Sequence, residues 1–315
     1  MKKSIHYAGL EIKPCTKMQK LIPVVGTDIE LPVTIINGKE DGKRIVVISG
    51  VHSGEYPGIE CAIELAQEMK PDDVSGSIVF IHPCNPTGFK SQVSYIVPED
   101  GKNMSESFPG KSNGTASEKI CHTITSNFIN DDCDMVMDLH GGDLHEHLST
   151  FVFASENGEE NIRELVLEVS NYMNVNYIVM AGFGVTEYAA NKGIPAFVLE
   201  RGGRGIWSKE EVDLYKKDVI NVFKFFGVVE GEAKYYGPKP YVFKKCDMMY
   251  APISGCWYPF VELEDQFEKG QRLGEIRDFH GKVLHTVYAE YDGVVHSYWS
   301  ALSVQKGQLM VGYGA

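Results

Sequence analysis

The stretch RIVVISGVHSGEYPGIECAIELAQEMK at residues 44–70, which SIVFIHP follows at 77–83, decides the fold class. Its opening, RIVVIS, contains four consecutive branched apolar residues and favours a buried strand. The segment IECAIELAQEMK at 59–70 places apolar residues at helical spacing, and SIVFIHP is a second strand-like run. A strand, a helix and a strand in this order predict a crossover unit.

The same alternation continues along the chain and defines an α/β domain. The predicted elements are a helix near 117–130, a strand at 134–140, a helix near 159–173, strands at 176–180 and 194–200, and a helix at about 208–227. The β-branched runs 31–37 and 44–49 are separated by the turn-rich GKEDGK, which predicts that these two strands pair. We therefore expect a mostly parallel or mixed sheet flanked by helices.

From Gly237 onward the sequence changes to short strand-like runs punctuated by glycine. Two related halves each contain a KGQ-L segment, at Lys269-Gly270-Gln271 and Lys306-Gly307-Gln308, which predicts a small β domain with internal near-repetition. This domain resembles the lipoyl/biotinyl-like β sandwich, but no lysine stands at an MKM-type or DK-type hairpin tip to carry a covalent cofactor. We expect an α/β domain at 1–236 and a C-terminal β domain at 237–315 that serves as a lid or an assembly surface.

Composition limits the function. Thirty Lys plus Arg against 43 Asp plus Glu give a net charge of −13, which argues against a nucleic-acid partner. No run approaches the roughly 20 apolar residues that span a bilayer, and the N-terminus lacks the apolar run of a secretory signal. Seven cysteines without CxxC spacing are typical of reduced thiols. These features predict a cytoplasmic protein without a membrane partner.

Two strand ends carry candidate metal ligands. His52 and Glu55 lie three residues apart in the loop after RIVVIS, and His140 follows the apolar run MVMDL. Two imidazoles and one carboxylate are a donor set that Zn²⁺ accepts in catalytic sites. The alternative is a loop hydrogen bond between His52 and Glu55. Asp138 is a candidate for orienting a ligand.

Five motifs in a fixed order carry a resemblance to a known family. They are G-x-H-x-x-E at 50–55, NP at 85–86, DGKN…FPG at 100–110, DLH at 138–140 and LE at 199–200. Their order is similar to that of the succinylglutamate desuccinylase/aspartoacylase family, a branch of the zinc carboxypeptidase-like fold, and the resemblance runs from about residue 20 to the C-terminus. It implies one Zn²⁺ per chain, held by His52, Glu55 and His140, with Glu200 as general base.

The position of Glu200 is compatible with that role. It ends the apolar strand IPAFVLE, where poor solvation raises the pKa of a carboxyl group toward neutrality. The alternative is a salt bridge from Glu200 to Arg201 or Arg204. His145 and His147 could be considered as further ligands, but His52, Glu55 and His140 already complete a mononuclear site.

The sequence departs from the family pattern where an acidic substrate would be held. Family members that act on such substrates carry Asn-Arg before FPG, and this chain has Ser105-Glu106 at that position. An arginine expected before the DG is also missing, and only Ser94 and Tyr95 are available there. We therefore expect Glu106 to favour a neutral or cationic group, unless it points to solvent. A replacement cation could come from Arg201, Arg204, Lys90 or Lys102.

The sequence thus predicts a zinc hydrolase that cleaves the amide bond of a small N-acyl amino acid or N-acyl amine. The predicted substrate contacts are Tyr95, Asn103, Ser105, Glu106 and Arg201. The alternatives are a zinc carboxypeptidase, an ester hydrolase, or a non-catalytic metal- or ligand-binding protein on the same fold. The aromatic residues of the β domain offer surface for a homo-oligomer, and the sequence leaves the oligomeric state open.

Overall fold

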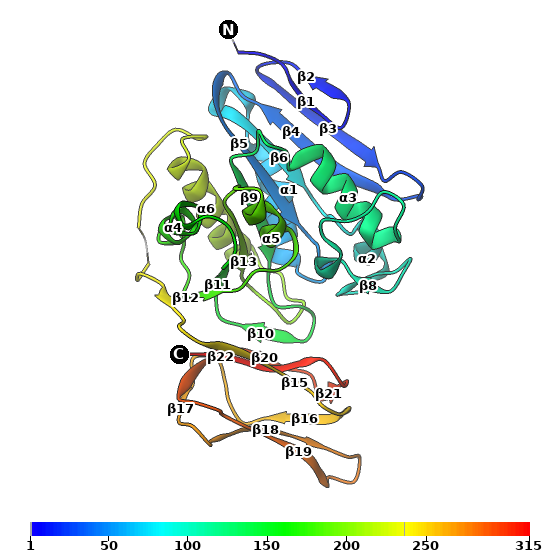
Figure 1. The fold of residues 1–315 in the computed structure, drawn as a ribbon, viewed down its shortest axis with the longest axis vertical. Coiled ribbons are helices and arrows are strands. Elements are labelled where there is room, and N and C mark those ends of the chain that lie inside the picture. The colour runs from blue at the N-terminus through cyan, green and yellow to red at the C-terminus, as the bar shows by residue number, and fades with distance from the viewer. Residues whose placement is uncertain (1, 236) are drawn as a thin grey trace.

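The computed structural model describes residues 2–235 and 237–315 (Figure 1). An α/β body contains a nine-stranded mixed sheet, and a group of short strands from the C-terminal part lies at one end of it. Tyr236, the last residue of the expected catalytic domain, lies outside the described residues.

The central sheet has the strand order β14-β12-β11-β13-β9-β5-β6-β4-β3. The bounds are β3 Thr16–Pro23, β4 Glu30–Asn37, β5 Glu40–Ser49, β6 Ser75–Ile81, β9 Met135–His140, β11 Phe151–Ala154, β12 Tyr177–Met180, β13 Ala196–Glu200 and β14 Tyr241–Val242. Strands β6, β5, β9 and β13 are mutually parallel, whereas β3, β4 and β11 pair antiparallel with a neighbour. The prediction of a mixed sheet is confirmed.

The crossover unit predicted from the opening stretch is present. Strand β5, helix α1 (Tyr56–Glu68) and β6 follow one another, and the two strands pair in parallel. The predicted pairing of 31–37 with 44–49 is wrong, because β6 lies between β4 and β5 and pairs with both. The short polar connection between the two runs suggested a hairpin. The apolar strand β6 instead lies buried between them.

Helices cover both faces of the sheet. Helices α3 and α5 share one hydrophobic core with the sheet, and α1, α4 and α6 share the core on the opposite face. The bounds are α2 Pro86–Ser91, α3 Ala116–Phe128, α4 Glu160–Ser170, α5 Gly184–Asn191 and α6 Lys209–Phe225, with 3₁₀ turns at Pro71–Asp73 and Ser105–Ser107. Small antiparallel pairs are formed by β1 (Ile5–Tyr7) with β2 (Leu10–Ile12) and by β7 (Ile96–Val97) with β8 (Lys102–Asn103).

The C-terminal residues form two antiparallel sheets that share a hydrophobic core containing Trp257, Leu273 and Val311. The bounds are β15 Cys246–Tyr250, β16 Gly255–Pro259, β17 Gln266–Phe267, β18 Arg272–Arg277, β19 Val283–Tyr288, β20 Gly293–Trp299, β21 Ser303–Val304 and β22 Leu309–Gly314. Each KGQ segment turns through a glycine of positive φ, Gly270 or Gly307, and leads into β18 or β22. The predicted near-repetition therefore corresponds to two similar turn-and-strand units.

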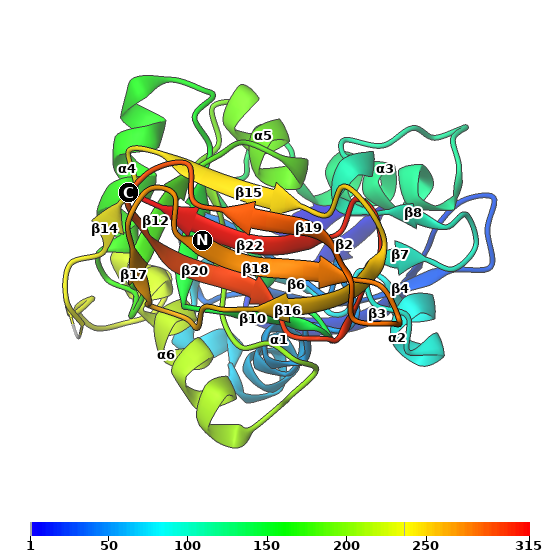
Figure 2. The same ribbon diagram turned by 90° about the horizontal axis from the view of Figure 1, so that it is seen from below.

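The two parts of the chain are joined by more than their covalent connection. Strand β10 (Glu146–Leu148), from the α/β part, pairs with β20 at the edge of a C-terminal sheet. Figure 2 shows the C-terminal strands lying across that end of the body. The Glu264 carboxylate accepts a hydrogen bond from Asn176 Nδ2 at 3.0 Å and further bonds from the Ser149 and Tyr177 hydroxyls. These contacts fix the C-terminal strands beside the carboxyl ends of β5, β9 and β13.

All seven cysteines are free thiols. Across residues 2–235 and 237–315, none of the helices has both the length and the apolar character that a membrane crossing requires.

Candidate metal centre and substrate cavity

His52 and Glu55 stand on the short loop that joins β5 to α1. Gly50 has a φ of +68°, which allows the sharp turn out of the strand, and Glu55 is the residue that precedes the first turn of the helix. A Cβ on Gly54 would lie 2.5 Å from Asp143 Oδ1 and 2.9 Å from Ser94 Oγ, so a larger residue would require these side chains to move. The loop therefore places both side chains at the edge of the sheet.

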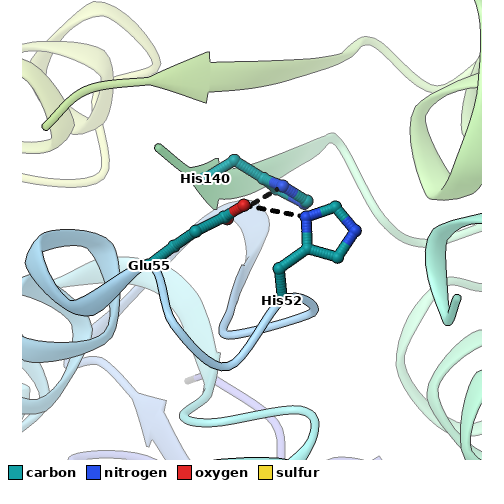
Figure 3. A group of neighbouring side chains, drawn as sticks. All are labelled: His52, Glu55 and His140. Carbon is teal, nitrogen blue, oxygen red and sulfur yellow. Dashed lines mark hydrogen bonds and ion pairs between the residues drawn. The ribbon is translucent and has the colours of Figure 1, made fainter. Parts of the chain in front are cut away.

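His140 reaches the same point from the next strand. It ends β9, which is the parallel neighbour of β5 and whose carboxyl end meets the same edge of the sheet. Figure 3 shows the Glu55 carboxylate between the two imidazole rings. Glu55 Oε1 lies 2.8 Å from His52 Nδ1, and Glu55 Oε2 lies 3.1 Å from His140 Nδ1. All three side chains are buried.

The outer nitrogen of each imidazole faces an oxygen atom. His52 Nε2 lies 3.1 Å from both Asn103 Oδ1 and Ser105 Oγ, and His140 Nε2 lies 3.1 Å from Asp138 Oδ2. The acceptor at His52 Nε2 favours the proton on that atom, which would leave the Nδ1 lone pair available to a metal, whereas the contact of His140 Nε2 with Asp138 is a close charge pair without hydrogen-bond geometry. The Nδ1 atoms of both rings converge on Glu55, an arrangement that could hold a shared metal ion.

The arrangement fits a small divalent cation. One ligand atom from each of His52, Glu55 and His140 lies within 4.8 Å of the others. Among the described residues, this is the group of three His, Cys, Asp or Glu side chains that could hold a metal ion. Ligands at about 2.1 Å around a tetrahedral Zn²⁺ would be about 3.4 Å apart, so small side-chain shifts would suffice. Burial opposes ionisation of Glu55, but the facing His140 and His52 lower the pKa of its carboxyl to about 2. The ligand carboxylate is therefore ionised at neutral pH.

Glu200 lies directly beside this group. It ends β13 in register with His140 on β9 and is 8% exposed. Burial raises the pKa of the Glu200 carboxyl well above its usual range, and the nearby Glu55 and Glu146 raise it further against the opposing effect of His140. This is the environment in which a carboxylate accepts and returns protons near neutral pH.

Arg201 does not line the cavity, although the sequence suggested a substrate contact or a pair with Glu200. Its guanidinium lies on the opposite face of the sheet, where Nη2 is 2.9 Å from Asp218 Oδ2 and donates to Asn174 O at 2.8 Å. Arg204 is exposed. The structure thus places Glu200 in the cavity and Arg201 in the core behind it.

A cavity of about 1190 Å³ opens over the metal centre. Its lining includes His52, His140 and Glu200 together with the predicted contacts Tyr95, Asn103, Ser105 and Glu106. The C-terminal strands close one side with Met248, Tyr250 and Trp299. The sequence suggested the aromatic residues of the β domain as surface for a homo-oligomer, and it did not indicate their part in the cavity.

Two further glutamates line the cavity, and neither was predicted from the sequence. Glu146 begins β10, and its Oε2 accepts a hydrogen bond from the Tyr95 hydroxyl at 3.2 Å. Burial, with Glu55 and Asp143 nearby, raises the pKa of Glu146 to about 7. Glu187 lies on α5, and its Oε1 accepts a hydrogen bond from Asn157 Nδ2 at 3.0 Å.

The remaining candidates lie elsewhere. The His145 ring is exposed and packs edge-on against Trp299, and His147 Nδ1 lies 3.2 Å from the Tyr298 hydroxyl. Lys90 is exposed, and Lys102 Nζ lies 3.9 Å from Glu118. Neither lysine lines the cavity.

The comparisons with known proteins agree on one family. A family model described as the succinylglutamate desuccinylase/aspartoacylase catalytic domain matches residues 41–226. N-alpha-acetyl-L-2,4-diaminobutyric acid deacetylase of Halomonas elongata is 25% identical over 295 residues, which cover 89% of this chain and 84% of that protein.

Solved structures show the same fold. The product-bound ectoine utilization protein EutE (DoeB) of Ruegeria pomeroyi matches with a TM-score of 0.84 and 21% identity over 95% of each chain. A succinylglutamate desuccinylase/aspartoacylase of Rhodobacter sphaeroides matches with a TM-score of 0.82 and 22% identity over 94% of each chain. The architecture of an α/β body with a large mixed sheet is therefore shared along nearly the whole chain.

Proposed function

The chain belongs to the succinylglutamate desuccinylase/aspartoacylase family, and from this membership and its site we propose that it is a zinc-dependent deacylase. The proposed reaction is hydrolysis of the amide bond in a small N-acyl amino acid or N-acyl amine. The observation that carries the proposal is the convergence of His52, Glu55 and His140 beside Glu200 at the floor of one cavity.

One Zn²⁺ per chain is the proposed cofactor, with His52, Glu55 and His140 as its ligands. Zn²⁺ bound there would lower the pKa of a water molecule toward 7 and polarise the acyl carbonyl. Asn103, Ser105 and Asp138 support the ligands, because their oxygen atoms face the outer nitrogens of the two imidazoles. In this proposal Asn103 and Ser105 orient His52 as well as bordering the substrate.

Glu200 is the proposed general base. It takes a proton from the attacking water, whose oxygen joins the acyl carbon as the C–N bond breaks, and it gives that proton to the leaving amine. The products are a carboxylic acid and a free amine. The burial of Glu200, which raises the pKa of its carboxyl group, supports both transfers.

The proposed substrate carries a positive or neutral group rather than a second acid. Glu106 lines the cavity where acidic-substrate relatives carry an arginine, and Tyr95 adds a hydroxyl group. The named substrate of the Halomonas elongata relative, an acetylated diamino acid, fits this preference.

The alternatives have less support. A carboxypeptidase would need a cation to hold the peptide carboxylate, and no Lys or Arg lines the cavity in the parts of the chain that the structure describes. An ester could be hydrolysed by the same groups. A non-catalytic binding protein would not need Glu200, a buried carboxylate with a raised pKa beside the ligands.

The C-terminal strands complete the proposed architecture. We propose that residues 237–315 are a lipoyl/biotinyl-like β sandwich that narrows the cleft of the 1–236 domain, and Tyr250 and Trp299 in the cavity lining support that role. The cysteine spacing favours a location in a reducing cytoplasm. The net charge of −13 favours a small-molecule substrate over a nucleic acid.

The test is hydrolysis of N-acetyl amino acids and N-acetyl diamines by zinc-loaded protein, with release of the free amine as the readout. Glu200→Gln should lower kcat by at least about 100-fold, because it removes a general base. Glu164→Gln on α4, an exposed residue outside the cavity, removes the same charge as a control. Activity that survives Glu200→Gln would refute the assigned base, and a lack of hydrolysis with every substrate would refute the deacylase.

A further inference from the structure

We propose that the cavity selects N-acyl derivatives of linear diamines and polyamines, which carry a free ammonium group at the far end and no carboxylate. This inference rests on the deacylase activity proposed above and names its substrate class. Three independent features support it: the charge of the cavity lining, the direction in which the cavity extends, and the chemistry of its walls.

The lining is acidic. Glu106, Glu146, Glu187 and Glu200 contribute carboxyl groups, and no lysine or arginine contributes to it within residues 2–235 and 237–315. Glu55 would offset part of the charge of Zn²⁺, and among the described residues none of the four glutamates has a Lys or Arg partner in the lining. A substrate carboxylate would meet like charge without a counter-ion, whereas an ammonium group would find a complementary wall.

The cavity lining continues along α5, which contributes one of its acidic residues. Gly184, Glu187, Tyr188 and Asn191 all line the cavity, and their spacing of three, four and seven residues places them on one face of the helix. A Cβ on Gly184 would lie 3.2 Å from the carbonyl oxygen of Ser105, so this face begins next to a residue that contacts His52. Seven residues of helix then extend it by about 10 Å.

Glu187 is therefore about one helical turn beyond the start of this face. Its carboxylate accepts the hydrogen bond from Asn157 Nδ2. This position suits the second amine of a chain whose acylated nitrogen lies at the metal centre. An α-carboxylate would instead stay beside the acylated nitrogen, close to Glu146 and Glu200.

Aromatic side chains form much of the remaining wall. Phe153 and Phe183 pack edge to face with ring centroids 4.9 Å apart, and Tyr188, Tyr250 and Trp299 border the same space. Aromatic rings bury methylene groups and attract ammonium groups through their faces. The cavity of about 1190 Å³ also exceeds the roughly 300–1,000 Å³ typical of small-molecule sites, and so admits a chain longer than one amino acid.

A matched pair of substrates isolates the carboxylate. Nα-acetyl-L-2,4-diaminobutyrate and mono-N-acetyl-1,3-diaminopropane have the same acyl group and the same terminal amine, and differ only in the α-carboxylate. N-propylacetamide, which lacks the terminal amine, and the mono-N-acetyl derivatives of 1,4-diaminobutane, 1,5-diaminopentane and a linear triamine complete the series. The readout is kcat/KM for amine release by the zinc-loaded full chain.

We expect mono-N-acetyl-1,3-diaminopropane to exceed its carboxylated counterpart at least tenfold, and kcat/KM to rise further with chain length. Glu187→Gln should raise KM for the longer amines by about tenfold, equivalent to about 1.4 kcal/mol, and raise it less for N-propylacetamide. Glu164→Gln, the exposed control on α4, should move neither value. Zinc content and thermal melting show whether each variant is folded.

The outcomes separate the two proposals. A preference for the carboxylated compound, or an equal KM increase for charged and neutral substrates in Glu187→Gln, overturns the polyamine inference and leaves the deacylase standing. No hydrolysis of any N-acyl compound overturns both.

Discussion

Replacing Asp138 by Asn should weaken zinc binding without unfolding the chain. The side chain is 3% exposed, and its Oδ2 lies 3.1 Å from His140 Nε2. The negative charge beside Nε2 favours the proton on that atom, although the pair lacks hydrogen-bond geometry, and so leaves the Nδ1 lone pair facing Glu55. Asn has nearly the same shape but lacks the charge. Loss of such a partner typically lowers metal affinity by about 10–100-fold, or about 1.4–2.7 kcal/mol.

A matched control is Asp134→Asn, at the residue that precedes the same strand. Asp134 pairs with Lys43 at 2.7 Å near the surface, where an ion pair contributes little to stability and has no contact with the metal centre. Competition with a chromophoric chelator measures the zinc Kd of both variants, and thermal melting in excess zinc checks their folding. A zinc Kd for Asp138→Asn within twofold of wild type, or an equal loss in both variants, would refute the reasoning.

Three further perturbations address the packing around the site. Arg201→Ala should lower the free energy of unfolding by about 3–5 kcal/mol, because it leaves the buried Asp218 carboxylate without this partner. Urea denaturation measures this loss, and a raised KM at unchanged stability would instead support a substrate contact. Gly54→Ala should reduce zinc affinity, because its Cβ would lie 2.5 Å from Asp143 Oδ1 and displace the ligand loop; calorimetric titration giving wild-type affinity would contradict this. Burial lowers the pKa of His296 to about 3, so the unfolded state binds more protons and stability falls as pH drops below about 6.5. Between pH 7 and 5 this should lower the free energy of unfolding by about 2 kcal/mol, measured with a chelator present so that metal binding does not contribute. The His296→Gln variant should lack this loss.

Local signals in the sequence predicted the elements better than their pairing. The runs that became β5, α1 and β6 have strong periodicity, and their crossover follows from chain order. The predicted hairpin between β4 and β5 failed, because strand pairing is decided by which apolar strands can be buried side by side. Strand β11, which has four residues, was not predicted from the sequence.

The candidate site likewise combines residues that the local sequence predicted with residues that only tertiary packing brings together. The motifs singled out His52, Glu55 and His140, and the structure brings these three side chains together, because strand ends are features of the local sequence. Arg201 was misplaced, although side chains alternate along a strand and a residue next to the cavity-facing Glu200 must face the other way. Glu187 and Tyr250 come from elements far apart in the chain, so only tertiary packing brings them to one cavity.

Zinc X-ray absorption spectroscopy of the purified protein tests the central claim most directly. The account predicts one zinc per chain with a first shell of only nitrogen and oxygen at about 2.0–2.2 Å. It also predicts the outer-shell scattering of two imidazoles, reduced in His140→Ala. A sulfur ligand at about 2.3 Å from one of the cysteines, or full zinc occupancy in a His52→Ala/His140→Ala double variant, would contradict it.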